Sequence, residues 1–265
     1  MSAITSKAQT TRNRILGIVN TENAQIIYSD TPGKIAAPAY KLQKLMNDFV
    51  DKSFEDADIL VFVTDKFEIY EEQDELILKM KNATCPIIIV LNKIDLYTQE
   101  VVDKLYQYWK DTFPLAMLHV ISAKENQGIN SLKESIESNL PMAPPYYDKD
   151  TLTDKSEKFF VAEIIREKIF LNYEKEIPYC TQVVIETFSD NPTIVKIAAI
   201  ILVERSSQVS IIVGANGAKI KKVGMDARVD IEKFLDKKVF LETKVKVKEN
   251  WRNDLSTLKN FGYTD

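Results

Sequence analysis

The sequence predicts an α/β domain with an open, mostly parallel sheet, followed by a smaller α+β domain. In residues 1–140, short apolar runs alternate with stretches of helical periodicity, which is typical of a parallel sheet covered by helices. Residues 141–150 contain three prolines within six positions, which favours a stiff, extended linker. We therefore expect one domain in residues 1–140, a linker in 141–150 and a second domain in 151–265; a length of 265 residues suits two modest domains.

Five apolar runs of the first domain are expected to be buried strands. They are Ile15–Val19, Gln25–Ser29, Ile59–Thr64, Pro86–Leu91 and Met117–Ile121. Helical spacing predicts helices at Tyr40–Glu55, Glu71–Asn82, Gln99–Thr112 and Ile129–Asn139. Open sheets of this kind bind ligands in the loops that follow the carboxyl ends of their strands, so those loops are the expected place of a site.

The second domain is expected to run helix, strand, strand, helix, helix, strand, with a last short helix. These elements are Lys155–Tyr173, Thr181–Thr187, Thr193–Glu204, Gln208–Val213, Ala218–Leu235, Lys238–Lys248 and Asp254–Phe261. Positive charge is local to this half. The whole chain has a net charge of -4, whereas residues 217–248 carry 10 basic and 5 acidic side chains. A nucleic-acid contact is therefore expected there and not over the whole molecule.

The cysteines and the apolar runs exclude several classes of protein. Cys85 and Cys180 lie far apart without metal-ligand spacing, which favours a reducing cytosol over a disulfide framework. The longest nearly apolar run, Ile194–Val203, contains a lysine and is too short to span a bilayer. The first 14 residues lack the apolar core of a signal peptide.

The sequence Asn92-Lys93-Ile94-Asp95 follows a predicted strand directly. In isolation it also suits a polar turn. An aspartate carboxylate accepts two parallel hydrogen bonds from N1–H and the 2-amino group of guanine, a donor pair that adenine lacks. Asn92 is expected to tie the loop and contact the base edge, and the alkyl stem of Lys93 to cover the base. After the last strand, the backbone N–H groups of Ser122 and Ala123 are expected near guanine O6.

A second motif, Asp30-Thr31-Pro32-Gly33, also ends a predicted strand. Such a sequence is common in ordinary turns. The functional interpretation places Asp30 on Mg²⁺ through water and the Gly33 N–H on a γ-phosphate. Upstream, Thr10 and Thr11 occupy the place of a switch threonine that ligates Mg²⁺, so Thr11 and Asp30 are the predicted metal ligands. The order of these motifs, each after a strand, indicates a guanine-nucleotide domain.

In the second half, Gly214-Ala215-Asn216-Gly217 lies between two predicted helices. An apolar run precedes it, and Ile220 with a basic amphipathic helix follows, as in KH domains. The glycines would let the backbone approach nucleotide phosphates, with Lys219, Lys221 and Lys222 supplying charge. The alternative is a turn between helices whose lysines face only solvent.

The two domains in this order resemble the Era family of bacterial GTPases over nearly the whole chain. The resemblance rests on the segments ITSKAQTTRNRI, DTPG, NKID, ISAK, FFVAEIIREKI, ILVER, GAKIKKVG and VKVKENW. It implies a P-loop-type G domain and a type II KH domain. It also implies GTP hydrolysis to GDP with Mg²⁺, binding of 16S ribosomal RNA and assistance in small ribosomal subunit assembly. The expected protein is a cytoplasmic monomer with peripheral contact to the cytoplasmic face of the membrane.

The chain departs from that family in its phosphate site. Among its seven glycines no two are five positions apart, so the pattern G-x-x-x-x-G-K-[ST] does not occur. The resemblance places the first strand, this loop and the first helix ahead of residue 1, so we expect an N-terminally truncated G domain without measurable GTP affinity. Lys34 replaces the side chain that positions water in many GTPases, so the catalytic group is unknown. The alternative is a non-catalytic RNA-binding KH protein whose degenerate G domain is an interaction platform.

Overall fold

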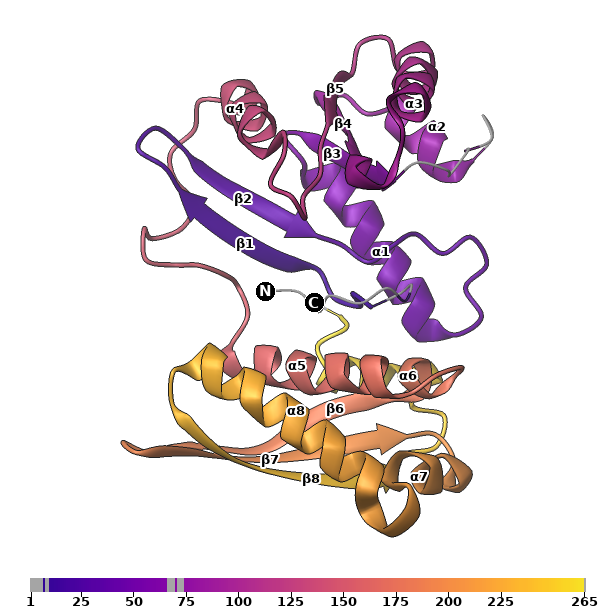
Figure 1. The fold of residues 1–265 in the computed structure, drawn as a ribbon, viewed down its shortest axis with the longest axis vertical. Coiled ribbons are helices and arrows are strands. Elements are labelled where there is room, and N and C mark those ends of the chain that lie inside the picture. Colours follow the sequence, from indigo (N-terminus) through magenta and orange to yellow (C-terminus); the bar gives the residue numbers. More distant parts are fainter. Residues whose placement is uncertain (1–6, 8–9, 66–69, 71–73, 265) are drawn as a thin grey trace. The chain divides into compact units, whose positions relative to one another are not determined.

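The structure, a computed structural model, describes residue 7 and residues 10–65, 70 and 74–264 (Figure 1). It separates into two compact units. Unit 1 comprises residues 1–19, 27–50 and 150–265, and unit 2 comprises residues 20–26 and 51–149. This division follows packing: one border falls between residues 149 and 150, beside the predicted start of the second domain at residue 151, but most of residues 1–50 group with residues 150–265. Its other borders pass through the strand pair β1 (Ile15–Asn20) and β2 (Gln25–Asp30) and through α1 (Lys41–Asp56).

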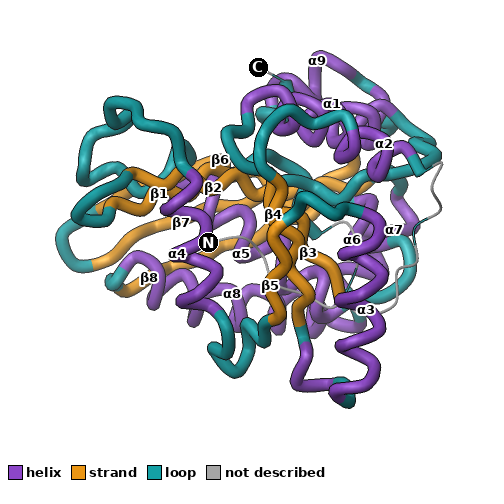
Figure 2. Tube along the Cα trace, turned by 90° about the horizontal axis from the view of Figure 1, so that it is seen from above, coloured by secondary structure: helices purple, strands orange, loops and turns teal. Residues whose placement is uncertain are grey.

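Unit 2 is built on a parallel sheet of β3 (Leu60–Asp65), β4 (Ile87–Asn92) and β5 (Met117–Val120), in that order. Figure 2 shows the three strands side by side. Its helices are α2 (Glu75–Lys81), α3 (Gln99–Thr112) and α4 (Ile129–Asn139), with the 3₁₀ turn η1 (Ile94–Leu96) after β4. Residues 71–73, the start of the predicted helix Glu71–Asn82, lie outside the described residues.

The central strand β4 is apolar because both of its faces are covered. Ile89 and Leu91 pack against Trp109 on one side. Ile88 and Val90 pack against a second group that includes Ile136 on the other. Fully burying a side chain of this size contributes about 1.5–3 kcal/mol, so this strand anchors the unit and fixes the loop that follows it.

The neighbouring strand β3 lies at an edge of the sheet as far as the described residues extend. Its valines Val61 and Val63 are 38% and 56% exposed, unlike their counterparts in β4. The sequence predicts one sheet for the whole first domain, whereas β1 and β2 form a separate two-stranded sheet joined by the turn Thr21–Ala24. An edge strand presents backbone N–H and C=O groups that can pair with a further strand.

The larger part of unit 1 is a three-stranded sheet of β6 (Gln182–Asp190), β7 (Ile194–Val203) and β8 (Lys238–Val247). β6 and β7 are antiparallel, and β7 and β8 are parallel. Helices α5 (Glu157–Asn172) and α8 (Ala218–Leu235) cover one face (Figure 1). The remaining elements are α6 (Ile177–Cys180), α7 (Ser206–Val213), η2 (Ala215–Gly217), η3 (Trp251–Asn253) and α9 (Leu255–Asn260).

Helix α5 is buried on more than one side, which explains why its apolar residues are spread around the helix and not confined to one stripe. Ser156 caps its first turn by accepting a hydrogen bond from Phe159. Val161 and Ile165 then face the core under the sheet. Arg166 is 1% exposed and donates to Glu163 and to the backbone carbonyl of Thr10. The helix therefore has both an apolar and an ionic contact surface.

Residues from the start of the chain complete unit 1. Arg12 is 3% exposed, and its guanidinium donates to the carbonyls of Pro178 at 3.0 Å, Tyr179 at 3.1 Å and Thr181 at 2.8 Å. These carbonyls end α6, where a cation is favourable. The ammonium of Lys7 donates in the same way to two carbonyls at the end of α5, those of Phe170 and Tyr173.

The first part of α1 also packs in unit 1. Leu42 and Met46 join Trp251 and Leu258 in one apolar cluster, and Trp251 donates from Nε1 to the carbonyl of Cys180 at 3.1 Å. Segments on either side of the Asp30–Gly33 motif are thus part of the same packed body as residues 150–265.

Candidate nucleotide and RNA sites

The side chain of Asn92 organises the loop after β4. Lys93 has a left-handed backbone with φ of 61°, an uncommon conformation for a residue with a Cβ. Oδ1 of Asn92 accepts hydrogen bonds from the backbone N–H of Lys93 at 2.7 Å and of Ala123 at 3.0 Å. Asn92 therefore joins the loop after β4 to the loop after β5, as the carboxyl ends of neighbouring parallel strands allow.

Asp95, in η1, presents its carboxylate at the surface of unit 2. Its Oδ1 accepts a hydrogen bond of 2.6 Å from the hydroxyl of Ser122, which is fully buried. The same hydroxyl oxygen accepts from the backbone N–H of Glu125 at 3.2 Å. The carboxylate is thus held from one side while it stays exposed on the other. Such an arrangement suits a ligand with two adjacent N–H donors, so the residues fit guanine.

Asp65 is a member of this site that the sequence analysis did not single out. It is the last residue of β3, and the register of the parallel sheet pairs it with Asn92. Its Oδ2 lies 2.5 Å from the Nζ of Lys93. The ion pair ties Lys93, in the loop after β4, to the end of the neighbouring strand β3. The sequence feature that could have identified Asp65 is its position as a carboxylate at the end of the neighbouring parallel strand.

The predicted switch residues Thr10 and Thr11 lie in unit 1. Thr10 is 8% exposed, and its hydroxyl donates to the carbonyl of Lys7 at 2.7 Å. Its own carbonyl accepts from Arg166. Thr11 is half-buried. The segment is therefore held by the residues around α5.

The Asp30–Gly33 motif follows β2 and also belongs to unit 1. Asp30 and Gly33 are exposed, Thr31 is half-buried and Pro32 is buried. A Cβ added at Gly33 would meet no atom within 4 Å, so nothing in the described packing demands a glycine there. The described residues contain no group of three or more His, Cys, Asp or Glu that fits a metal ion. Two side chains alone do not make a Mg²⁺ site, so a metal at the predicted ligands Thr11 and Asp30 would need further ligands from water and phosphate oxygens.

The loop Gly214–Gly217 joins α7 to α8 in a conformation that requires glycine at position 214 and favours it at position 217. Gly214 has φ of 70° and ψ of 179°, a region essentially closed to other residues. A Cβ at Gly214 would also lie 2.7 Å from Cγ of Lys219. Asn216 and Gly217 have φ of 51° and 76°. The loop thus presents bare backbone at the N-terminus of the 18-residue helix α8, where the helix dipole favours anions.

Tyr173 supports this loop through a hydrogen bond to the end of α7. Its hydroxyl donates to the carbonyl of Ile212, near the end of α7, at 2.6 Å. Burial raises the pKa of the phenol to about 12. The Nζ of Lys219 lies 5.9 Å from the centroid of the Tyr173 ring. The lysine stem therefore folds across Gly214, which explains the close contact at that glycine.

The other predicted RNA-binding residues lie along the start of α8. Ile220 is half-buried against the core, whereas Ala215, Asn216, Lys221 and Lys222 are exposed. Exposed lysines beside an open backbone loop provide positive charge for phosphates without burying it.

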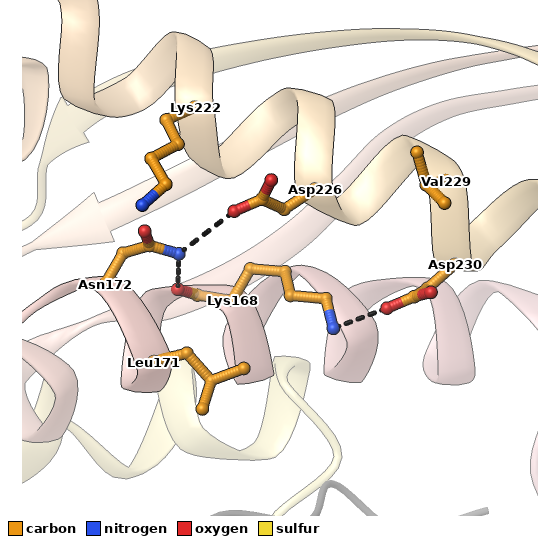
Figure 3. A pocket seen from close by; sticks show the side chains of 7 residues that line it. All are labelled: Lys168, Leu171, Asn172, Lys222, Asp226, Val229 and Asp230. Carbon is orange, nitrogen blue, oxygen red and sulfur yellow. Dashed lines mark hydrogen bonds and ion pairs between the residues drawn. The ribbon is translucent and has the colours of Figure 1, made fainter.

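A groove of about 450 Å³ between α5 and α8 was not predicted from the sequence (Figure 3). Lys168 and Asp230 form an ion pair of 2.5 Å across it, and this contact lowers the pKa of the Asp230 carboxyl. Asn172 donates to the carbonyl of Lys168 at 2.9 Å and to Asp226 at 3.4 Å. The amine of Lys222 lies at the same groove in Figure 3, which joins it to the basic start of α8.

Comparison with known proteins agrees with this two-part organisation. A model of the KH domain matches residues 176–252, and a model described as 50S ribosome-binding GTPase matches residues 1–93. GTPase Era of Elusimicrobium minutum is 41% identical over 266 residues, which is 99% of this chain and 88% of that protein. The chain belongs to the Era family of GTPases.

Solved structures of the Era family share this fold. An Aquifex aeolicus Era variant bound to GDP.AlF4- has a TM-score of 0.93, 33% identity, and coverage of 100% of this chain and 91% of that chain. Era in complex with MgGDPNP and nucleotides 1506–1542 of 16S ribosomal RNA gives the same TM-score and identity, with 90% of that chain covered. The predicted fold class, a G domain followed by a KH domain, is confirmed.

Some Era relatives are longer than this chain. The chloroplastic Era-like GTPase of Oryza sativa subsp. japonica is 44% identical over 268 residues, and the chain covers 63% of it. For the chloroplastic Era GTPase of Zea mays, the identity is 42% and the covered share is 64%.

Proposed function

We propose that this Era-family chain binds 16S ribosomal RNA through the loop Gly214–Gly217 and takes part in assembly of the small ribosomal subunit. The observation that carries the proposal is the bare backbone of this loop at the N-terminus of α8, flanked by exposed Lys221 and Lys222. Loops of this kind clamp nucleotide phosphates while neighbouring apolar side chains take the bases. The relative in complex with nucleotides 1506–1542 of 16S ribosomal RNA supports the choice of RNA.

The test is the salt dependence of RNA binding. For a labelled RNA with the sequence of those nucleotides, each phosphate contact changes the slope of log K against log salt by about 0.7. Replacing Lys221 and Lys222 by Gln is expected to reduce the slope by about 1.4. The matched control replaces Lys104 and Lys110, two lysines of α3 in unit 2, and leaves the slope unchanged. Equal slopes for both double variants would refute the proposal.

We further propose that the loop after β4 binds the guanine base of GTP and that the chain acts as a GTP-dependent switch. Asp95 reads the N1–H and 2-amino donors of the base, held by Ser122, and Asn92 and Lys93 shape the loop. Thr10 or Thr11, Asp30 and Gly33 form the phosphate side, with Thr11 and Asp30 on Mg²⁺ and the Gly33 N–H on the γ-phosphate. The open space at Gly33 supports a close approach by a ligand. Mg²⁺ would neutralise phosphate charge there.

The 265-residue polypeptide is not expected to bind GTP by itself, because its sequence contains no G-x-x-x-x-G-K-[ST] loop. Such a loop supplies several hydrogen bonds to charged phosphates, at roughly 1.5–3 kcal/mol each. Losing four removes about 6–12 kcal/mol, whereas micromolar affinity is about 8 kcal/mol in total. The free edge of β3, with exposed Val61 and Val63, supports the expectation that a strand belongs there.

Calorimetric titration with GDP tests this. The 265-residue polypeptide is expected to show no binding, and a version extended upstream by a strand, a G-x-x-x-x-G-K-[ST] loop and a helix is expected to bind in the micromolar range or tighter. Binding by the unextended chain, or failure of the extended one, would contradict this part of the proposal without touching the RNA part.

The alternative is an RNA-binding protein in which the first domain is a platform for other proteins. It is favoured by the packing of the Thr10 and Asp30 segments within unit 1, together with the RNA-binding residues. Under this alternative the unextended unit 2 unfolds cooperatively. A melting transition of unit 2 without GDP affinity would support it, whereas protease-sensitive unit 2 residues beside a stable unit 1 would support an incomplete G domain.

The cellular location, the membrane contact and the oligomeric state are proposed from membership of the Era family. We propose a cytoplasmic monomer with transient contact to the cytoplasmic face of the membrane. No helix in the described part of the chain is long and apolar enough to cross a bilayer. Co-sedimentation with anionic vesicles tests the membrane contact, and sedimentation velocity tests the monomer.

A further inference from the structure

The strand β7 has a composition that its own unit does not explain. Nine of its ten residues are apolar, in the sequence IVKIAAIILV. Strands with such continuous apolar runs are normally covered on both faces, whereas a half-solvated strand alternates apolar and polar residues. Here α5 and α8 cover one face, where Val195, Ile197 and Ala199 are buried (Figure 1). The other face has no cover within the described residues of unit 1.

The register of the sheet defines this open face. Ile200 of β7 lies opposite Val184 of β6, with Ala198 and Leu202 on the same face of β7. All four side chains are only half-buried, and none belongs to the core cluster under the helices. They form an aliphatic stripe across the sheet. At one end of it Phe240 of β8, 57% exposed, lies opposite Lys196.

Lysines border the aliphatic stripe. Lys238 and Lys244 of β8 share a face with Phe240, as does Lys246, because residues two apart in a strand point the same way. The acidic residues of the face are Glu242, paired with Lys244 at 3.1 Å, and Glu186, 3.6 Å from Lys246. Four lysines against two glutamates leave an excess of positive charge. Among the described residues, no ion pair involves Lys196 or Lys238.

We propose that the open face of the β6–β7–β8 sheet docks an acidic amphipathic segment of a protein partner. The aliphatic stripe would take the partner's apolar side chains, and the lysine border its carboxylates, as an apolar centre with a polar rim does in protein interfaces. A second copy of this chain is disfavoured because its face carries the same excess of positive charge. Single-stranded RNA is disfavoured because the centre offers aliphatic side chains, not the rings on which bases stack.

The size of the face sets the expected affinity. Three strands about 4.8 Å apart and five alternating positions about 6.6 Å apart span a few hundred Å². A stable interface buries about 800 Å² per partner, so we expect a transient contact with a Kd of about 100 μM. Exposed charges contribute, so binding should weaken several-fold between 50 and 300 mM salt.

The experiment uses the full chain and a labelled synthetic 18-residue peptide with leucine at positions i, i+3, i+4 and i+7 and glutamate at most others. Fluorescence anisotropy is expected to show binding that weakens at least tenfold in the double variant Phe240→Ala, Lys196→Glu. A matched control, Met225→Ala with Arg228→Glu, changes an exposed apolar residue and an exposed basic residue of α8 and should leave the affinity unchanged. Because a strand substitution can disturb folding, Lys196→Glu with Lys238→Glu, two exposed positions, serves as a second test, and thermal melting checks each variant.

Each other outcome overturns the proposal. No peptide binding up to 1 mM, or equal weakening in test and control variants, removes the docking face. Loss of affinity for a twelve-residue poly(U) RNA in the Phe240 variant, with peptide binding unchanged, identifies the occupant as RNA. Concentration-dependent self-association that the same variant abolishes identifies a second copy. None of these results depends on RNA binding at Gly214–Gly217.

Discussion

The hydroxyl of Ser122 donates a 2.6 Å hydrogen bond to Oδ1 of Asp95, across 27 positions of sequence. The donor is fully buried two residues after the end of β5, and the acceptor is exposed in η1 after β4. A buried serine thus orients a surface carboxylate. This hydrogen bond fixes the orientation in which the Asp95 carboxylate meets a ligand.

Replacing Ser122 by alanine is expected to weaken GDP binding by the upstream-extended chain about 10- to 150-fold, since a hydrogen bond to a charged group contributes roughly 1.5–3 kcal/mol. Calorimetric titration measures the effect. Ser138→Ala is the control, because that hydroxyl donates to the carbonyl of Ser135 and accepts from Nδ2 of Asn139, both within α4. An unchanged Kd for the Ser122 variant would show that Asp95 needs no support.

The two glycines of the RNA loop should not tolerate alanine equally. Gly217 has φ of 76° and open space where a Cβ would lie, so Gly217→Ala should cost about 1 kcal/mol of unfolding free energy. At Gly214 the φ/ψ pair is closed to alanine and a Cβ meets Lys219, so the cost should exceed that of Gly217→Ala by about 1–2 kcal/mol. Urea unfolding of both variants measures the difference, and equal costs would contradict the loop geometry.

Tyr173 should report on the same loop through its ionisation. Its pKa of about 12 lies above the usual 10, so the neutral phenol stabilises the fold fully below pH 10, and this contribution is lost as the pH rises toward 12. Tyr173→Phe leaves the Ile212 carbonyl without its donor and should cost about 1–2 kcal/mol at pH 7. Urea melts at pH 7 and pH 11 measure both effects. In Tyr146→Phe, at an exposed linker position, neither should appear.

Arg12 should be the most sensitive charged residue of unit 1. Arg12→Lys shortens the side chain and removes the planar group that reaches three carbonyls, so unfolding free energy should fall by about 2–4 kcal/mol. Arg228→Lys, at an exposed position of α8, should change it by less than about 0.5 kcal/mol. Thermal melting compares the two, and similar losses would mean that the contacts of Arg12 add nothing.

The elements and the guanine loop were predictable because their signals are local. The expected strand Pro86–Leu91 is β4 at Ile87–Asn92, and the expected helix Ala218–Leu235 is α8 without change. Asn92 and Asp95 are separated by three positions, so a motif describes them. The four-residue helix α6 has too few residues for a periodic pattern and was missed.

Contacts between distant segments had no such signal. The pairing of Lys93 with Asp65 depends on the register of two parallel strands. The burial of Arg12 depends on carbonyls about 170 positions further along the chain. Every residue has a backbone carbonyl, so the sequence does not show which carbonyls accept these hydrogen bonds. For the same reason, the division of the first domain between two compact units did not follow from its motifs.

The contacts of Arg12 also impose an order on biosynthesis. A ribosome adds about 5–20 residues per second, so Thr181 emerges some 8–34 seconds after Arg12, which lies 169 positions before it. During that interval the guanidinium remains hydrated and the start of the chain has no finished surface on which to fold. Unit 1 therefore closes only near the end of translation, and its earliest residues are among the last to find their native partners. Nascent chains arrested before residue 178 should expose this segment to proteases, whereas released chains should protect it.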